Sequence, residues 1–523
     1  MSHTNLELAS QTLEFLAEAQ VVSLCVCPGA RNSPWIEKLK ADPRFENFYF
    51  FDERSAGFFA LGKSRSTGNP VAVLTTSGTA VGELLPAVME AYYTGAKLMI
   101  LSADRPKRFR GTGAPQSCLQ PGIFSIYARS AFDLDRDSKP LTKFESKENI
   151  FPLHLNVCFE EPLPTSESNR LNLGSFEPGG SNTEENFVRA SVASKYPLLI
   201  VGELSKAEAR ELLPHLLTWK VPVVTEALSH LREEPALDSL RIRPHKKIWE
   251  EALQSGYKID FVLRLGGIPT LRFWRDLEVH AEASKVPVFS TGDSPFSGMP
   301  RASHMQISLT TWLAKNVFRT NFNTDAFLNW KTSHDNHFKY LEEVITSHPL
   351  SEPTWFRNLS VHIPQGSQVY LGNSLPIREW DLTSCTHDKQ FLFKANRGLN
   401  GIDGQFSTFL GGLSKDAENW AILGDLTTLY DSTGPWILSQ LKNHYAWHLV
   451  IINNSGGRIF ERMFSGTAYL NQHSISFEHW AKQWTLSFKK ISDPRELRGL
   501  TEHIIEICPA EDQTREFWKS WEP

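Results

Sequence analysis

Cysteine is scarce in this sequence, with six residues among 523 and no CxxC pair. Disulfide scaffolds are dense in cysteine, and structural zinc sites need closely spaced ligand pairs. The sequence therefore excludes both classes. We expect reduced thiols and a cytoplasmic location.

Long apolar runs are also missing. The strongest runs, residues 98–101 and 449–452, have the length of strands, far below the ~20 residues of a membrane-spanning helix. The N-terminal segment carries Glu7, Glu14 and Glu18 and has no basic region before an apolar stretch. We therefore expect neither a signal peptide nor a membrane span.

Neither positively nor negatively charged residues are in large excess. Lys plus Arg total 54 and Asp plus Glu total 59, which gives a net charge of −5. No basic stripe interleaved with aromatic residues is present, so the sequence predicts no nucleic-acid partner. The composition, 41% hydrophobic and 22% charged, is typical of globular proteins. At ~150 residues per domain, the length favours about three domains.

Short apolar runs alternate with helical patterns, and small polar residues follow the runs. Residues 21–27 lead into Pro28-Gly29, and residues 71–74 lead into TTSG. Such alternation is typical of a doubly wound parallel α/β sheet, whose ligands bind outside the carboxyl ends of the strands. The pattern restarts twice, and residues 165–186 are polar and linker-like. We predict three α/β domains with doubly wound parallel sheets, over residues 1–185, 186–345 and 346–523.

Polar side chains follow two neighbouring runs of the third domain. Asp425 follows WAILG, and Asn454 follows WHLVII at 454 − 425 = 29 residues further on. This is the length of one strand–helix–strand crossover, so the two side chains should meet at one sheet edge. Their oxygens, with a nearby backbone carbonyl, suit Mg²⁺, and Gly456 permits close backbone approach. Each fragment alone is also compatible with an ordinary turn.

Glu53 follows a short apolar strand and starts a helical run. An acidic residue at a helix start is commonplace by itself. The surrounding blocks are longer and more specific, and they are PGARNSP (28–34), DERSAGFFALG (52–62), TTSGTAVGELLPAVMEA (75–91), LMILSADRP (98–106), GNSLPIREWD (372–381) and ANRGLNGIDG (395–404). They resemble the 2-succinyl-5-enolpyruvyl-6-hydroxy-3-cyclohexene-1-carboxylate (SEPHCHC) synthase family of menaquinone biosynthesis, within the thiamine-diphosphate enzymes. The GDL at residues 424–426 departs from the GDG common in that superfamily.

The resemblance implies three domains of the thiamine-diphosphate-enzyme type and a decarboxylating transferase. Such an enzyme would decarboxylate 2-oxoglutarate and add the succinyl-semialdehyde carbanion to isochorismate, giving SEPHCHC and CO₂. It would use thiamine diphosphate with Mg²⁺ or Mn²⁺. The alternative is another thiamine-diphosphate 2-oxo acid decarboxylase or carboligase with a different acceptor.

The resemblance also assigns roles to residues that contact the cofactor. Glu53 would be the catalytic glutamate that holds N1′ of the aminopyrimidine. The remaining assignments are Asp425 and Asn454 as side-chain metal ligands, Gly456 as carbonyl ligand, Ile459 as the apolar prop under the cofactor, and Phe460 as part of the same wall. Ordinary core packing is the alternative for Ile459.

Both expected substrates are dianions, which favours arginine because its fork pairs with carboxylates. The residues at the family's substrate positions are Arg31, Arg105, Gln116, Arg272, Arg397 and Lys415. We interpret Arg378 as structural. Ala30, Leu271 and Lys415 depart from the Ser, basic residue and Arg that the family commonly has. The superfamily places its cofactor between two chains, so we expect a homodimer or a dimer of dimers.

Overall fold

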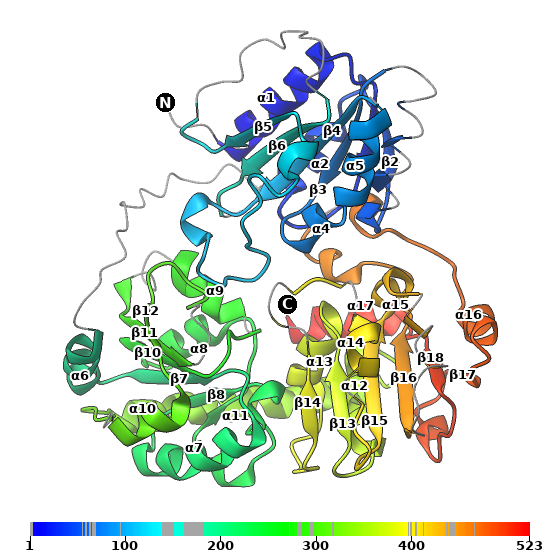
Figure 1. The fold of residues 1–523 in the computed structure, drawn as a ribbon. Helices are drawn as coiled ribbons and strands as arrows, with labels where there is room; N and C mark the ends of the chain where they lie inside the picture. The colour runs from blue at the N-terminus through cyan, green and yellow to red at the C-terminus, as the bar shows by residue number, and fades with distance from the viewer. Residues whose placement is uncertain are drawn as a thin grey trace. The chain divides into compact units, whose positions relative to one another are not determined.

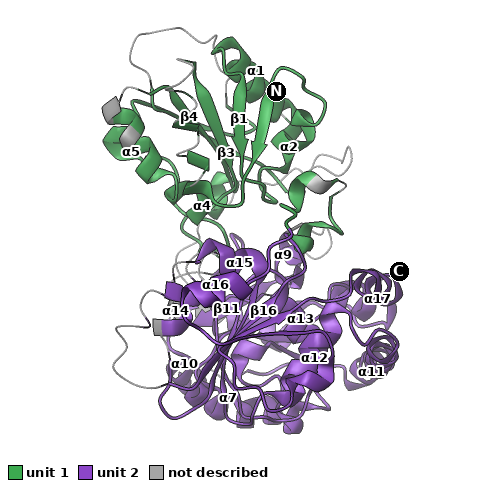
Figure 2. Cartoon of the chain, turned by 90° about the vertical axis from the view of Figure 1, so that its right-hand side faces the viewer, with its two compact units in different colours: residues 1–176, 398–401, 457–473 green, residues 177–397, 402–456, 474–523 purple. Residues whose placement is uncertain are grey.

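The structure is a computed structural model. It describes residues 4–54, 56–57, 60–61, 64, 69–94, 96–138, 151–161, 183–270, 272–279, 285–292, 297–315, 318–395, 397, 400–402, 405–411, 413–432, 434–435, 438, 445–464 and 466–522. Among these residues, no helix combines the length and apolarity needed to cross a membrane. The chain forms two compact units (Figure 2). Unit 1 comprises residues 1–176, 398–401 and 457–473, and unit 2 comprises residues 177–397, 402–456 and 474–523.

Three six-stranded sheets organise the chain, and every strand pairs in parallel with its neighbours (Figure 1). The strand orders are β2-β1-β3-β4-β6-β5, β12-β11-β10-β7-β8-β9 and β14-β13-β15-β16-β18-β17. In each order the sheet extends to both sides of its first strand, which is β1, β7 or β13. The predicted fold class, three doubly wound α/β sheets, is confirmed.

The sheet of unit 1 is covered on both faces because its central strands are buried along their whole length. Leu24 and Val26 point toward the layer of α1 and α2, whereas Cys25 and Val73 point toward the layer of α5. The strands are β1 (Ser23–Val26), β2 (Glu46–Tyr49), β3 (Val71–Thr75), β4 (Leu98–Asp104), β5 (Ser130–Leu134) and β6 (Leu153–Cys158). The helices are α1 (Asn5–Glu18), α2 (Ser33–Leu39), α4 (Thr79–Gly82) and α5 (Leu85–Thr94).

Unit 2 contains the other two sheets. The first has the strands β7 (Pro197–Val201), β8 (Val223–Thr225), β9 (Arg241–Ile242), β10 (Phe261–Leu265), β11 (Val288–Gly292) and β12 (Ser303–Gln306). Its helices are α6 (Thr183–Ala193), α7 (Lys206–Trp219), α8 (Ile248–Gln254), α9 (Arg272–Val279) and α10 (Leu309–Lys315). The long helix α11 (Thr324–Ser347) follows, and it packs against α17 (Glu511–Trp521) through Phe338, Leu341 and Trp521.

The second sheet of unit 2 carries apolar layers on both faces. Trp355 and Ile377 contribute to one layer, and Phe406 and Phe409 contribute to the other. Its strands are β13 (Gln368–Leu371), β14 (Leu392–Lys394), β15 (Asn419–Gly424), β16 (Trp447–Ile452), β17 (Phe488–Ile491) and β18 (Ile504–Ile507). Its helices are α12 (Glu352–His362), α13 (Leu375–Thr383), α14 (Gln405–Gly411), α15 (Asp425–Tyr430) and α16 (Glu478–Gln483).

The predicted domain limits fall inside helices. The limit after residue 185 lies in α6, and the limit after residue 345 lies in α11. Most of the expected linker at 165–186 lies outside the described residues. Residues 457–473 belong to unit 1, where Tyr469 joins the core beside α2 and donates a hydrogen bond to Glu37 Oε1. The domain limits themselves stay predictions.

Candidate active-site residues

Glu53 lies at the carboxyl edge of the unit 1 sheet. It begins a helical segment just after β2, and it is 8% exposed. Thr75 at the end of β3 places Oγ1 3.4 Å from Glu53 Oε1 and donates a hydrogen bond to it. Burial raises the pKa of the neighbouring Cys27 thiol, and the charge of Glu53 adds to that effect. The buried carboxylate therefore occupies the edge where a parallel sheet binds its ligand.

The loops after β1 and β3 meet at this edge because two glycines allow close approach. A Cβ on Gly29 would lie 2.5 Å from the Thr76 side chain. Gly78 has φ +92° and faces the backbone of Gln116, whose Cα would lie 3.4 Å from an added Cβ. The Gly78 N–H donates to Gln120 Oε1 at 2.9 Å. The fold thus brings the predicted substrate residue Gln116 against the loop that follows β3.

Arg31 and Arg105 converge on one carboxylate. Arg31 follows β1 and Arg105 follows β4, and their side chains are 6% and 9% exposed. Arg31 Nη2 lies 2.5 Å from Glu161 Oε1, and Arg105 Nη1 lies 3.9 Å from the same oxygen. Arg105 Nε also donates to the Pro115 carbonyl at 2.7 Å. The structure therefore brings these two predicted residues together and adds Glu161, which no motif indicated.

The predicted metal ligands lie together in unit 2. Asp425 begins α15 directly after β15 and is 2% exposed. Its Oδ2 accepts a hydrogen bond from the Gly456 N–H at 2.9 Å, which ties it to the loop after β16. Gly456 has φ +141°, a conformation that favours glycine. Asn454, in the same loop, donates Nδ2 to both oxygens of Glu352, at 3.0 and 2.9 Å.

This donor set fits a divalent cation. It offers a buried carboxylate, a side-chain amide oxygen and a backbone carbonyl, all hard oxygen ligands within one loop pair. Because Asn454 turns its Nδ2 toward Glu352, its Oδ1 points away from that carboxylate. The residues present therefore fit Mg²⁺ or Mn²⁺, the ions that the sequence predicted.

Arg397 and Arg378 form a second cationic region in unit 2. Arg397 Nη1 donates to Asn373 Oδ1 at 2.7 Å, while its Nε is buried with no partner among the described residues. Burial lowers the pKa of Arg397, against the opposing charges of Glu226 and Asp381. Arg378 is exposed to solvent, and the charge of the nearby Arg397 lowers its pKa. An accessible guanidinium beside a like charge can receive an anion, and the interpretation of Arg378 as structural stays a prediction.

Comparison with known proteins identifies the family. Residues 6–123 match the family described as thiamine pyrophosphate enzyme, N-terminal TPP binding domain. A Bdellovibrio bacteriovorus protein named 2-succinyl-5-enolpyruvyl-6-hydroxy-3-cyclohexene-1-carboxylate synthase is 42% identical over 99% of this chain and 99% of its own length. An Akkermansia muciniphila protein of the same name is 36% identical over 97% and 98%. This chain belongs to the SEPHCHC synthase family. The predicted family, enzyme class and thiamine-diphosphate cofactor of the synthase are thereby confirmed.

Two further predicted substrate residues of the synthase lie in exposed positions. Arg272 begins α9, and its Nε lies 3.3 Å from Asp276 Oδ1 on the same helix. Lys415 is exposed on the bend before β15, at the amino end of that strand. Asp425 follows the opposite end, so the structure does not bring Lys415 to the carboxyl edge. Leu271 lies outside the described residues.

Ile459 and Phe460 lie in the short 3₁₀ turn η7 (Arg458–Phe460). Both are partly buried, and Phe460 packs against the core that α1 and α2 cover. This turn belongs to unit 1, whereas the adjacent Gly456 belongs to unit 2. The partial exposure of Ile459 is compatible with contact to a ligand, and its role as an apolar prop stays a prediction.

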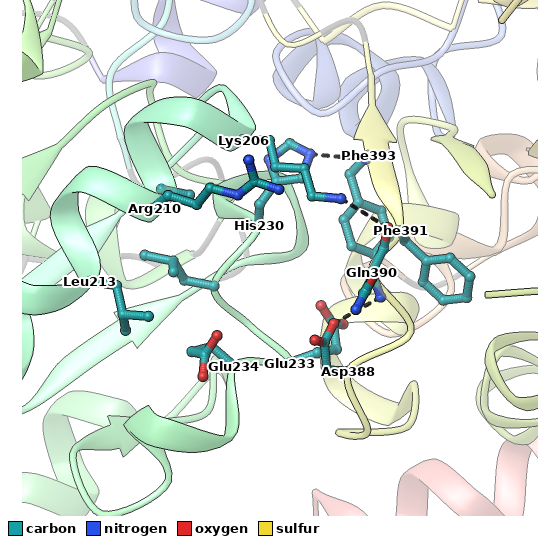
Figure 3. A pocket seen from close by; sticks show the side chains of 12 residues that line it. Lys206, Arg210, Leu213, His230, Glu233, Glu234, Asp388, Gln390, Phe391 and Phe393 are labelled. Carbon is teal, nitrogen blue, oxygen red and sulfur yellow. Dashed lines mark hydrogen bonds between the residues drawn. The ribbon is translucent and has the colours of Figure 1, made fainter. Parts of the chain in front are cut away.

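A separate cavity of about 230 Å³ lies within unit 2 (Figure 3). Lys206 and Arg210 stand on one side, and Glu234 and Asp388 stand on the other. None of the predicted site residues lines it. Because its charges are mixed, this cavity offers a dianion no clear advantage over the arginine regions.

His245, Glu251 and His334 bring three potential metal-ligand atoms within 4.8 Å of one another. The other ring nitrogens already accept backbone hydrogen bonds, His334 Nε2 from Arg243 at 2.9 Å and His245 Nδ1 from Lys247 at 3.3 Å. The nitrogens that face Glu251 must then carry the protons and donate them to the carboxylate. A metal-ligating histidine has the reverse arrangement, so this cluster is a hydrogen-bonded network.

Proposed function

We propose that this synthase decarboxylates 2-oxoglutarate and transfers the remaining succinyl-semialdehyde unit to isochorismate, releasing CO₂ and SEPHCHC for menaquinone biosynthesis. The observation that carries the proposal is the set of arginines at strand ends. Arg31 and Arg105 are buried at the edge that holds Glu53, and Arg397 keeps a buried Nε donor without a partner among the described residues. Two dianionic substrates need such cations, because a buried carboxylate must be paired.

The cofactor and the protein residues have different roles in the proposed reaction. Bound thiamine diphosphate supplies the electron sink for the carbon that loses CO₂. We infer that Glu53 holds the aminopyrimidine by a hydrogen bond to N1′, where its burial excludes competing water. Asp425, Asn454 and Gly456 would hold Mg²⁺ or Mn²⁺, and Ile459 and Phe460 would contact the apolar face of the cofactor.

The arginine side chains are arranged in a way that suits binding of substrate carboxylates. Arg31 and Arg105 direct nitrogens toward one point, now occupied by Glu161 Oε1. A substrate carboxylate would share these donors, with Gln116 as a neutral partner nearby. Arg397 would use its Nε, and Arg378 would add its charge. Arg272 stays a candidate, whereas the position of Lys415 offers no support for substrate contact.

The decisive assay measures CO₂ release from 2-oxoglutarate by the protein with thiamine diphosphate and Mg²⁺, with and without isochorismate. We expect release to rise sharply with isochorismate and isochorismate to be consumed in equal amount. Release that ignores isochorismate would favour the alternative, a decarboxylase or carboligase with another acceptor. No release under either condition would overturn 2-oxoglutarate as the donor.

We infer that the active form is a homodimer, or a dimer of dimers, in which each site takes Glu53 from one subunit and the metal ligands from the other. Mixing inactive Glu53→Gln and Asp425→Asn proteins tests this arrangement. Subunit exchange would rebuild one intact site in each mixed dimer, so about one quarter of wild-type activity should return. If each site belonged to a single subunit, mixing would restore nothing. All six cysteines are free thiols, which fits the cytoplasmic location that we infer.

A further inference from the structure

Glu352 holds the amide of Asn454. Both carboxylate oxygens lie within hydrogen-bond distance of Asn454 Nδ2, at 3.0 and 2.9 Å. Glu352 is 2% exposed, so its charge is removed from bulk water. A carboxylate in this position accepts hydrogen bonds only, and a charged acceptor makes them stronger than a neutral one.

This contact decides which atom of the amide points into the loop. An asparagine can present either its oxygen or its NH₂ group, and only the oxygen binds a cation. The reversed amide would set Oδ1 against the carboxylate oxygens of Glu352, which is repulsive. The arrangement with Nδ2 toward Glu352 leaves Oδ1 directed to the other side. Glu352 therefore selects the ligand face of Asn454.

Glu352 itself is held in place at the start of α12. Its backbone N–H donates to Thr514 Oγ1 at 2.9 Å, and Ser351 and Pro353 flank it as N-cap and second helical residue. A carboxylate in the first helical turn is stabilised by the helix dipole. The side chain thus starts from a fixed backbone, 102 residues before Asn454 in the chain.

We propose that Glu352 is the positioning residue of the metal site, which fixes Asn454 as an oxygen ligand and adds a buried negative charge beside the cation. This inference rests on the proposed function, because it assumes that Asp425, Asn454 and Gly456 bind Mg²⁺ or Mn²⁺. Partners of this kind typically contribute about 10–100-fold to metal affinity.

Binding of Mn²⁺, followed by the electron paramagnetic resonance signal of the free ion in the presence of thiamine diphosphate, tests the proposal without an activity assay. We expect Glu352→Gln to raise the Mn²⁺ dissociation constant about 10–100-fold, because glutamine can also donate and so permits the reversed amide. Glu342→Gln is the matched control. Glu342 contacts the same helix α12 through Arg357, not Asn454, so its variant should bind Mn²⁺ like the wild type.

Exchanging the donor and the acceptor of this hydrogen bond should rescue Mn²⁺ binding. In the double variant Glu352→Gln/Asn454→Asp, the introduced glutamine donates to the introduced aspartate, and the net charge of the pair is unchanged. We expect Asn454→Asp to improve Mn²⁺ affinity more in the Glu352→Gln background than in the wild type. Equal effects in both backgrounds would overturn the positioning role. If Glu352→Gln alone folds poorly, the double variant is compared with Asn454→Asp alone, and we expect the double variant to bind Mn²⁺ more tightly because it restores a hydrogen bond between the two side chains.

The Asp425→Asn variant distinguishes an error in the role of Glu352 from an error in the proposed metal site. If it weakens Mn²⁺ binding while Glu352→Gln does not, only the role of Glu352 is wrong. If Asp425→Asn also leaves Mn²⁺ binding unchanged, the metal site of the proposed function is wrong. Thermal unfolding of each variant without metal checks that the fold is retained.

Discussion

The two units hold their cationic side chains in opposite electrostatic settings. In unit 1, Arg31 and Arg105 share the carboxylate of Glu161, whose Oε1 lies 2.5 and 3.9 Å from them. In unit 2, the charge of Arg397 disfavours that of Arg378, and the carboxylates of Glu226 and Asp381 act on both arginines from nearby. A substrate anion must therefore compete with a directly paired carboxylate in unit 1, whereas in unit 2 it would also relieve the effect of Arg397 on Arg378.

The carboxylates differ between the units as well. Glu53 of unit 1 accepts a hydroxyl hydrogen bond from Thr75, whereas Asp425 of unit 2 accepts the backbone N–H of Gly456. A backbone contact fixes a ligand oxygen more firmly than a rotatable hydroxyl does. This difference agrees with the proposed roles, proton-linked contact with the cofactor for Glu53 and metal ligation for Asp425.

The largest expected effects come from substituting these two carboxylates, and they differ in kind. Glu53→Gln should lower kcat by about 10²–10⁴-fold, since the amide cannot share a proton as a carboxyl group does. It should leave the Mg²⁺ concentration for half-maximal activity unchanged. Asp425→Asn should raise that Mg²⁺ requirement steeply. Steady-state rates over an Mg²⁺ titration measure both, and near-normal turnover in Glu53→Gln would contradict its assigned role.

The next effect concerns the repelling pair of unit 2. Arg378→Gln should raise KM for one substrate about 10–100-fold, the range for losing one charge-assisted hydrogen bond. Lys415→Gln is the control, because Lys415 lies at the amino end of β15, away from the edge that carries Asp425. Substrate titrations of both variants provide the measurement. A large KM change for Lys415→Gln would support the sequence-based assignment of that residue.

A smaller effect of opposite sign is expected in unit 1. Glu161→Gln keeps an oxygen acceptor for Arg31 but removes the competing charge, so KM for the substrate should fall about 2–10-fold. Glu160→Gln is the matched control. Glu160 is the adjacent residue, and its Oε1 lies 2.8 Å from Arg108 Nη1 and so pairs with a different arginine. A higher KM in Glu161→Gln would show that this residue mainly positions the arginines.

The last effect concerns stability in acid and not activity. Burial lowers the pKa of His154 in unit 1 and of His334 in unit 2 to about 4. Both pKa values lie below the unfolded value near 6.5, so the unfolded chain binds protons first as the pH falls. Stability should be full above about pH 6.5 and decrease from there toward about pH 4, by up to about 3 kcal/mol for each histidine.

Urea unfolding at pH 7.5 and pH 5 measures this decrease. Trp35 is the one tryptophan in the sequence of unit 1 and is buried, so the difference in fluorescence between the protein and its Trp35→Phe variant gives a Trp35 signal that reports on that unit. His154→Asn should reduce the pH dependence of the Trp35 signal, and His334→Asn should not. Equal effects of the two variants on this signal would show that the units unfold together.

The sequence predicted what depends on local pattern. Continuous apolar runs predicted three parallel sheets, because strands covered on both faces are apolar throughout. The crossover spacing predicted that Asp425 meets the loop of Asn454, and the Gly456–Asp425 hydrogen bond agrees with it. The sequence also placed Arg31 and Arg105 among the substrate residues, but their convergence on Glu161 was not predicted.

The sequence could not predict contacts between distant segments. Glu161 lies 130 residues from Arg31, and Glu352 lies 102 residues from Asn454. Neither carboxylate stands in a motif, and only tertiary packing selects it. Lys415 lies before β15 and not after it, which its motif position did not indicate, and its role in substrate binding stays a prediction.

The membership of residues 457–473 in unit 1 limits how this protein can be dissected. Tyr469 lies in the unit 1 core, donates a hydrogen bond to Glu37 and carries the Lys40 Nζ over its ring at 4.9 Å from the centroid. A gene fragment that ends at residue 176 would express unit 1 with this apolar patch uncovered. Domain shuffling at the unit boundary would therefore require a grafted copy of the 457–473 segment, not a single cut.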